Sequence, residues 1–337
     1  MTIKRYNAGV QRAKGLLEMA SSLFESSLSS ESWRAAEGVL QTDSRVGHGV
    51  RLSLGSGNTK EISLTMATGG FPEVLAVGEG KLSLAWVNPS VSLTLAHRGK
   101  GFFPRPLALR TLAVFPSYDI MAFAVHESTG ITSLSQIKKD RFPLNISTRQ
   151  VDPTALRENS TMFTVGAVMA AAGFAFEDIR QWGGNIHLSV RPSDPARRNG
   201  IESGQVTAVF DEGIKSWIRT ALENGFRFLP VEGDVMARLK EMGYRPAILS
   251  KSRYEDLPGD VQTVDFSGWP MIVHAEMPDE VAYALCEAIE SRQEVIPTDN
   301  YKPLDMTELC NNGEETPYDV PLHPGAERFY REKGYLK

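Results

Sequence analysis

Cysteine is scarce in this sequence of 337 residues, which contains only Cys286 and Cys310. Two thiols cannot form a disulfide framework, and their spacing matches no thiolate zinc site, so small disulfide-stapled and zinc-finger proteins are excluded. Whether the two thiols form one bridge stays open. The six histidines are scattered and show no metal-ligand spacing. We therefore expect neither a metal nor a cofactor.

Long apolar runs are also missing. A membrane-spanning helix needs about 18 or more apolar residues in a row, whereas the longest run, 167–176, is short and rich in alanine. The N-terminus has Lys4 and Arg5, but Arg12 and Lys14 interrupt the apolar core that an export signal requires. As written, the chain is therefore expected to be cytoplasmic, and periplasmic if an upstream signal is missing from the sequence.

The sequence has little excess charge, because 36 basic and 41 acidic residues give a net charge of −5. Nucleic-acid-binding proteins usually carry a basic excess or a dense basic stripe, so we expect no nucleic-acid partner. Hydrophobic residues make up 42% and charged residues 23%, which is ordinary for a soluble globular protein. At about 150 residues per domain, this length indicates roughly two domains.

The common catalytic motifs are absent. There is no G-x-x-x-x-G-K-[ST] phosphate loop and no G-x-S-x-G nucleophile elbow, and the glycines at 55–57 lack the third glycine of a dinucleotide loop. His126-Glu127 has no second histidine four residues later, which excludes a zinc-protease helix. Nucleophilic catalysis therefore has no support in the sequence, and we name no catalytic residue.

What the sequence does contain is an alternation of short strands and helices. Residues 10–28 place leucines at helical spacing, which predicts an amphipathic helix that docks by its leucine face, and residues 32–40 predict a second helix. Alternating apolar residues at 50–54 and 62–66 predict two strands around a Gly/Asn turn. Further strands are expected at 82–87, 109–115, 120–126, 143–148, 186–190 and 206–210, and helices at 71–80, 91–97, 132–139, 162–172, 213–224, 235–242 and 279–290. This alternation predicts an α/β protein with mainly parallel sheets.

Four stretches carry a resemblance to a known family. They are TGGFPEVLAVGEGKLSLAWV at 68–87, STGITSLSQIK at 128–138, ESGQVTAVF at 202–210 and PLHPGAERFYREKG at 321–334. In this order they resemble the TAXI group of TRAP-transporter solute receptors, and the last stretch is the most specific of the four. The sequence departs from the group by having Ser83 where an aspartate is usual, and by its long helix before the first strand.

The resemblance implies an α/β fold of the type II periplasmic-binding-protein kind, with two lobes and a hinge of crossing strands. Lobe 1 would comprise residues 45–118 and 245–337, with the helical segment 1–44 packed on it, and lobe 2 would comprise residues 119–244. In such a fold the ligand lies between the lobes, where strand ends and helix N-termini present unpaired N–H groups that suit a carboxylate.

Ten residues at expected strand ends and helix starts are the candidate ligand-binding residues. Arg149 is the expected anchor, since a guanidinium binds a carboxylate through two parallel hydrogen bonds, and we expect it to face solvent when no ligand is bound. Capping of helices by Asn88, Ser90, Asp211 and Glu212, packing of Tyr118 at the hinge, and a solvated Arg149 are the alternatives that stay open. The candidates are Thr68, Gly69, Asn88, Ser90, Tyr118, Thr148, Arg149, Ser160, Asp211 and Glu212.

The expected function is binding of a small organic carboxylate, as the solute receptor of a TRAP-type transport system with membrane transporter subunits as further partners. One alternative is a cytosolic enzyme on the same fold, resembling a decarboxylase or a pyrimidine-precursor synthase, since one fold serves many functions. His126, His187 and His274 would then be candidate acids or bases. A cytosolic metabolite sensor is the third possibility.

Overall fold

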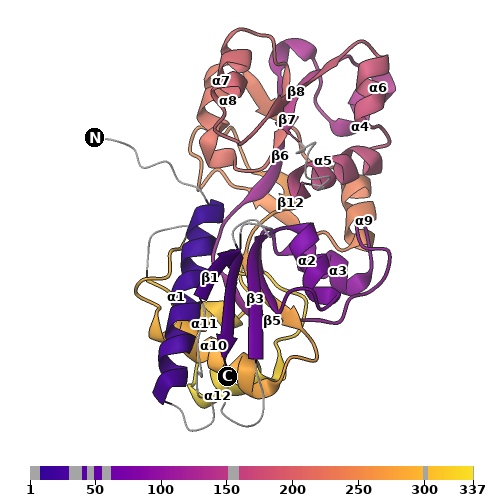
Figure 1. The fold of residues 1–337 in the computed structure, drawn as a ribbon. Coiled ribbons are helices and arrows are strands. Elements are labelled where there is room, and N and C mark those ends of the chain that lie inside the picture. The colour runs from indigo at the N-terminus through magenta and orange to yellow at the C-terminus, as the bar shows by residue number, and fades with distance from the viewer. Residues whose placement is uncertain are drawn as a thin grey trace, which may run out of the picture. The chain divides into compact units, whose positions relative to one another are not determined.

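The computed structural model describes residues 8–29, 40–43, 49–54, 62–150, 159–298 and 303–336. The chain divides into two compact units: unit 1 comprises Met1–Tyr118 and Ser267–Lys337, and unit 2 comprises Asp119–Phe266. Each unit contains a β-sheet with helices packed against it (Figure 1). The predicted α/β class is therefore confirmed.

The sheet of unit 1 combines strands from both ends of the chain. Its strand order is β1-β2-β3-β4-β13-β5. β13 lies after the second crossing, the point at Ser267 where the chain returns from unit 2 to unit 1. It runs antiparallel to both of its neighbours, β4 and β5. The strands are β1 (Leu40–Asp43), β2 (Gly49–Leu54), β3 (Ile62–Gly69), β4 (Leu84–Val87), β5 (Leu109–Phe115) and β13 (Trp269–His274). The helices are α1 (Ala8–Ser29), α2 (Phe71–Gly78), α3 (Val91–Arg98), α10 (Asp279–Ser291), α11 (Met306–Cys310) and α12 (Pro324–Glu332).

The sheet of unit 2 has the order β11-β12-β6-β9-β7-β8, and β10 also pairs with β6. Its strands are β6 (Ile120–His126), β7 (Asn145–Arg149), β8 (Asn185–Ser189), β9 (Ala208–Asp211), β10 (Phe226–Phe228), β11 (Pro246–Leu249) and β12 (Val261–Asp265). Its helices are α4 (Leu134–Asp140), α5 (Ser160–Ala171), α6 (Phe176–Gln181), α7 (Pro195–Glu202), α8 (Ile218–Glu223) and α9 (Gly233–Met242), with the 3-10 turns η2 (Glu127–Thr129) and η3 (Ile214–Ser216).

The expectation of mainly parallel sheets is wrong. Among the described strands, only β3–β4, β7–β8 and β7–β9 pair in parallel. The other pairs are antiparallel. β1, β2 and β3 follow one another in the chain and lie side by side in the sheet. The strand before the chain leaves unit 1, β5, pairs with β13, the strand after it returns, and in unit 2 the first strand, β6, pairs with the last, β12. The second crossing lies at Ser267 rather than at about 245, since β11 pairs with β12 and β12 pairs with β6 of unit 2.

Most individual elements lie close to their predicted positions. The strands β5 and β6 have the predicted bounds, since each is an apolar run bordered by turn residues. The helix expected at 213–224 is instead η3 followed by α8, with a break at Trp217. The helix expected at 32–40 is wrong at Leu40, which begins β1, and residues 32–39 lie outside the described residues.

Helix α1 packs on unit 1 by its apolar face, as the leucine spacing predicts. Leu16, Met19, Ala20 and Leu23 are buried in the core cluster of this unit, and α1 contacts α10, β2 and β3. A methyl group added at Gly15 would overlap the ring of Trp86. The absence of a side chain at Gly15 therefore lets the helix approach the sheet closely.

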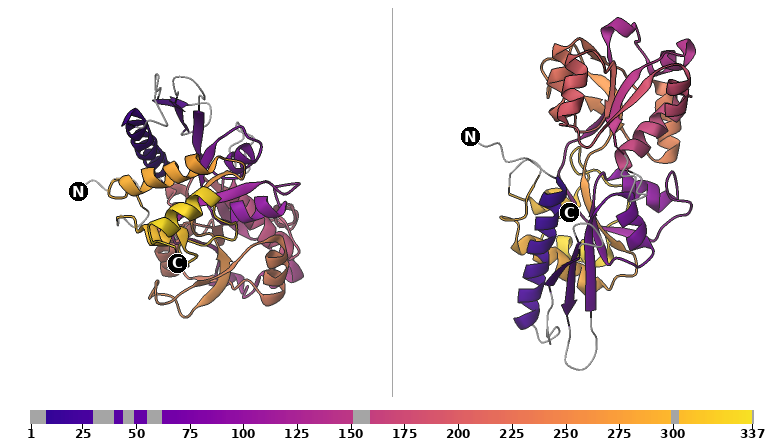
Figure 2. Two further views of the ribbon diagram at one scale, coloured as in Figure 1. Left: turned by 90° about the horizontal axis from the view of Figure 1, so that it is seen from below. Right: turned by 45° about the horizontal axis from the view of Figure 1, so that its top comes forward.

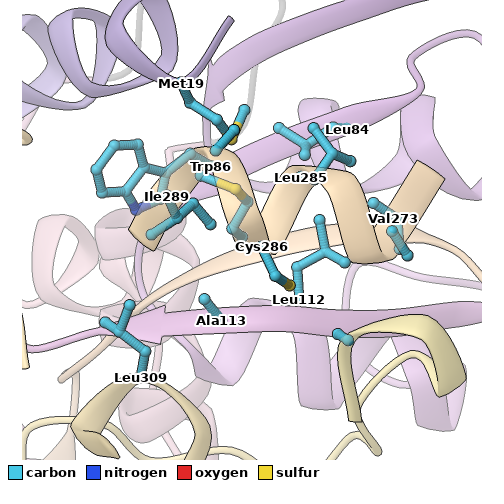
Figure 3. Packing of buried hydrophobic residues seen from close by; sticks show 14 of the residues in the cluster. Met19, Leu84, Trp86, Leu112, Ala113, Val273, Leu285, Cys286, Ile289 and Leu309 are labelled. Atoms are coloured by element: carbon cyan, nitrogen blue, oxygen red, sulfur yellow. The ribbon is translucent and has the colours of Figure 1, made fainter. Parts of the chain in front are cut away.

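The core of unit 1 is built around Trp86 of β4 (Figure 3). Its ring is fully buried, its centroid lies 4.1 Å from that of Phe115, and its Nε1–H donates to the carbonyl of Trp269 over 3.1 Å. Helices α10 and α12, which close this core, lie side by side (Figure 2). Cys286 and Cys310 are buried here as free thiols.

Substituting Gly15 tests the docking of α1. Gly15→Ala should destabilise the protein by about 1–3 kcal/mol, because the added methyl overpacks the contact with Trp86. The control is Gly166→Ala in α5, where an added methyl meets no atom within 4 Å; it should stabilise by about 0.5–1 kcal/mol, the usual gain of alanine over glycine in a helix. Urea unfolding of both variants measures whether each change lowers or raises the free energy of unfolding. Stabilisation by Gly15→Ala would show that α1 does not dock as described.

Candidate functional site

Charged side chains converge at one edge of the sheet in unit 2. Arg149 ends β7 and Asp211 ends β9, and these two strands run parallel, so both side chains start from the same edge. β6 runs antiparallel to β9, which places Asp119, the residue before β6, at this edge as well. Glu212 follows Asp211, and Arg197 approaches from α7. We call these five residues the charge cluster.

Arg149 is held on three sides. Its Nε–H donates to Asp211 Oδ1 over 3.2 Å, one Nη1–H donates to the carbonyl of Val190 over 3.0 Å, and its Nη2 pairs with Glu212 Oε1. The side chain is only 14% exposed. Arg149 therefore does not simply face solvent, as the sequence led us to expect; two carboxylates at the end of β9 neutralise it and orient it.

Arg197 is a member of the cluster that the sequence analysis missed. It is 2% exposed; its Nε–H donates to Ser147 Oγ over 3.0 Å, and its Nη2 pairs with Asp211 Oδ2. Helix α7 begins at Pro195, and the carboxylate of the preceding Asp194 caps it by accepting from the N–H of Ala196. The helical spacing could have indicated that Arg197 is buried, because it lies three and four residues before Gly200 and Ile201 and so shares their buried helix face.

Asp119 and Glu212 form a carboxyl pair within the cluster. Asp119 Oδ1 accepts from the N–H groups of Ile120 (2.9 Å) and Gly213 (3.0 Å), and its carboxyl group also hydrogen-bonds the side chain of Glu212. Gly213 has φ 63°, a left-handed conformation, and the ring of Pro192 occupies the place where a side chain would lie. This turn aims the Gly213 N–H at Asp119.

The electrostatics of the cluster follow from burial and proximity. Burial, together with the charge and the hydrogen bond of Glu212, raises the pKa of Asp119 well above its ordinary value. Burial also raises the pKa of Asp211, while Arg197 and Arg149 act in the opposite direction. For Arg149, burial acts to lower the pKa, but the carboxylates of Glu212 and Asp211 outweigh it, so its pKa is raised.

The two other candidates in unit 2 are Thr148 and Ser160. Thr148 is fully buried, and its Oγ1–H donates to Met162 Sδ over 3.4 Å. Ser160 is the first residue of α5. The amides at this helix start are capped by Asn159, whose Oδ1 accepts from Thr161 N–H (2.9 Å) and from the N–H of Met162.

The candidates in unit 1 lie at the ends of β3 and β4. Asn88 N–H donates to the carbonyl of Gly69 over 3.1 Å. Ser90 is buried; its N–H donates to the carbonyl of Ser267 over 3.2 Å, and its Oγ–H donates to that of Pro317. The Ser90 hydroxyl thus serves the packing of unit 1. Thr68 lies in β3, and its side chain is not described.

Helix α2 carries an anion of its own at its N-terminus. Glu73 is 6% exposed, and its Oε2 accepts from Gly70 N–H over 2.8 Å. The Glu73 carboxylate also lies against Gly69, where an added Cβ would overlap it. The helix start that the sequence assigned to a ligand carboxylate therefore already holds one. The four-residue pattern G-x-x-E could have indicated this capping interaction.

The candidates fall into one group in each unit. Thr148, Arg149, Asp211 and Glu212 lie at one sheet edge of unit 2, and Gly69, Asn88 and Ser90 lie together in unit 1. Tyr118 is half-buried and is the last residue of the first segment of unit 1.

The three candidate histidines are not part of the charge cluster. His126 ends β6, at the opposite end of that strand from Asp119, and its Nδ1 lies 2.7 Å from Ser128 Oγ. His187 lies within the edge strand β8, and His274 ends β13 of unit 1.

Within the part of the chain that the structure describes, no group of three or more His, Cys, Asp or Glu side chains is placed to hold a metal ion. No helix there is both long and apolar enough to span a bilayer.

The geometry of Arg149 suits the binding of a small anion. A guanidinium has five N–H groups, and the contacts with Asp211, Val190 and Glu212 use three of those of Arg149. Among the described residues no other acceptor takes the two N–H groups that remain, which leaves them for a ligand. Because the three contacts already fix the guanidinium, little side-chain entropy would be lost when an anion binds.

Comparison with known proteins places the chain in a family. The NMT1-like family matches residues 49–334, and the chain belongs to it. The mixed α/β class of its two sheets is the class predicted from the sequence.

Similar solved structures include solute-binding proteins. One is a TctC solute-binding protein from Polaromonas (12% identity, TM-score 0.37, 77% of this chain and 80% of that chain covered). A second is PhnD1 from Prochlorococcus marinus in complex with methylphosphonate (13% identity, TM-score 0.37, 79% and 84% covered). A third is an ancestral arginine-binding protein bound to arginine (11% identity, TM-score 0.31, 66% and 71% covered).

Proposed function

We propose that this protein is the solute-binding component of a TRAP-type transport system and that its solute is a small organic carboxylate held by Arg149. The observation that carries the proposal is the state of Arg149: a nearly buried guanidinium, fixed in orientation, that keeps two N–H groups for a further acceptor. The stretch at 321–334, which resembles the end of TAXI-group receptors, supports the transport system named here.

The charge cluster explains why a carboxylate would bind there without distorting the protein. Asp211 is shared between Arg149 and Arg197, so its charge is balanced from two sides. Arg149 can therefore offer its two remaining N–H groups while Asp211 stays paired. A bidentate contact of this kind contributes about 1.5–3 kcal/mol. Thr148, which precedes Arg149 in β7, and Ser160 stay candidates for further contacts, as do the residues of unit 1.

Mass spectrometry under native conditions tests the proposal. Protein purified without denaturation should carry a small carboxylate that is released on unfolding, and calorimetry with the released compound should give its affinity. Arg149→Ala should weaken binding by about ten- to a hundredfold, the equivalent of the lost charge-assisted contact. Arg149→Lys should recover only part, because an ammonium group cannot make the planar double contact.

The control is Arg198→Ala, an exposed arginine on α7 of the same unit, which should leave the affinity unchanged. Arg149→Ala should also lower the stability of unit 2, since Asp211 and Glu212 lose a partner. Affinities should therefore be compared on folded protein, and Arg149→Lys decides if the alanine variant does not fold. Parent-like affinity in both Arg149 variants would place the anchor elsewhere.

A further inference from the structure

A second hollow in unit 2 lies at the opposite end of β7 from Arg149. β7 begins at Asn145, shortly after α4 ends, and Arg149 is its last residue. The C-terminal ends of α4, α5 and α6 border a hollow of about 780 Å³, which is within the range of about 300–1,000 Å³ usual for small-molecule sites. We call it the basic hollow. The residues of its lining that decide what it can bind are Lys138, Lys139, Arg141, Gly173, Asp178 and Trp182.

The lining of the basic hollow carries an excess of positive charge. Lys138, Lys139 and Arg141 are exposed, and within the described residues none of these side chains has an ion-pair or hydrogen-bond partner. Asp178 is the one carboxylate of the lining, and its Oδ2 accepts from a backbone N–H over 2.7 Å, which caps α6. Even when the exposed Asp140 beside them is counted, three cations face two carboxylates. Such a surface attracts anions, although the whole chain has a net charge of −5.

Arg141 has a backbone conformation that glycine normally adopts. It follows the last residue of α4 with φ 47°, and among the described residues it is the only non-glycine residue with a positive φ. Helices commonly end on glycine or asparagine at such a position, because the Cβ of other residues is strained there. The last turn of a helix favours cations, which accounts for Lys138 and Lys139. It does not account for a strained arginine at the next position, and strain of this kind is found mainly at functional sites.

The basic hollow also contains a glycine and an aromatic ring. Gly173 has φ 89°, and a Cβ atom there would lie 2.6 Å from Lys138 Nζ, so the lysine occupies the space that a side chain at this position would need. Trp182 is half-buried, and its ring centroid lies 6.2 Å from that of the buried Phe174. The buried ring supports the tryptophan, whose remaining surface lines the hollow. A planar ring of a ligand stacks favourably on such a side chain.

We propose that the basic hollow binds a small molecule that joins an aromatic ring to a diphosphate group, such as a nucleoside diphosphate. Trp182 stacks on the ring, and the three cations bind the phosphate oxygens. The guanidinium of Arg141 can make two parallel hydrogen bonds to a phosphate, while a lysine ammonium binds it as a point charge. Because the basic hollow and Arg149 lie at opposite ends of β7, this site is separate from the carboxylate site. The inference therefore goes beyond the proposed function and does not depend on it.

Calorimetry with ADP tests this site on the full chain, with adenosine, pyrophosphate and a hexaglutamate peptide as comparisons. ADP should bind, and adenosine and pyrophosphate should each bind at least about tenfold more weakly, because each lacks either the charge-assisted contacts or the stacking. Adenosine or pyrophosphate that binds as tightly as ADP would overturn the proposal, as would an absence of ADP binding. Tighter binding of the hexaglutamate peptide than of ADP would also overturn it, since the hollow would then be a docking surface for an acidic protein.

Two variants place the binding in the basic hollow. Arg141→Gly should weaken ADP binding by about tenfold, and it should also lower the unfolding constant by about threefold in urea unfolding, because glycine relieves the strain. Trp182→Ala should weaken ADP binding by at least about fivefold, and Trp182→Phe, which keeps a ring, should recover most of it. The control is Lys240→Gln, which removes an exposed cation from the last turn of α9 and should leave the ADP affinity unchanged. Parent-like ADP affinity in Arg141→Gly or in Trp182→Ala would overturn the proposal, and Arg141→Gly decides if the tryptophan variant does not fold.

Discussion

Replacing Arg197 by methionine is expected to destabilise the protein by about 3–5 kcal/mol, the usual cost of removing one partner from a buried ion pair. Asp211 is fully buried, and its Oδ2 pairs with the Arg197 guanidinium. Methionine fills the volume of the aliphatic stem but leaves the carboxylate without that partner. Ser147 Oγ and the carbonyl of Pro192 also lose their donor. Urea unfolding measures the loss.

Arg198→Met is the matched control, because the neighbouring arginine is exposed on the same helix; it should change the stability by no more than about 0.5 kcal/mol. Adding Asp211→Asn to Arg197→Met should restore part of the loss, since a neutral amide at this buried position no longer needs two guanidinium partners. A loss below about 1 kcal/mol for Arg197→Met would mean that Arg197 is not the partner of a buried charge.

Trp86→Ala should destabilise unit 1 by about 3–5 kcal/mol, as large-to-small substitutions of a buried tryptophan generally do. The ring is fully buried, it contacts Phe115, and Gly15 of α1 lies against it, so the cavity would open between the sheet and α1. The substitution also removes the donor to the carbonyl of Trp269. Besides urea unfolding, hydrogen exchange of the α1 amides should become faster.

Trp182→Ala provides the comparison, since this tryptophan at the end of α6 is only half-buried and should cost clearly less. If Trp86→Ala left the exchange of α1 unchanged while lowering the stability, the tryptophan would support the sheet but not the docking of the helix.

Local sequence patterns were sufficient to predict most of the individual helices and strands. The apolar runs that form β5 and β6 and the leucine face of α1 depend on residues close in sequence, and each was found at or near its observed bounds. Arg149 and the pair Asp211-Glu212 were found for the same reason, because each follows directly on an apolar strand. The order of strands could not be predicted in this way, since β13 lies between β4 and β5 in the sheet of unit 1 although it is more than 150 residues later than β5 in the chain.

The partners of these residues depend on contacts that no local pattern contains. Arg149 and Asp211 are 62 residues apart, Arg197 and Ser147 are 50 apart, and Asp119 and Gly213 are 94 apart. The sequence by itself therefore determined an α/β chain, its docking helix and an arginine at a strand end. Only the tertiary structure decided that this arginine is already paired, that Arg197 completes the cluster and that Asp119 meets Glu212. The physical reason is that a strand's sequence determines which face is buried, whereas the neighbour of each strand end is determined by the order of strands in the folded sheet.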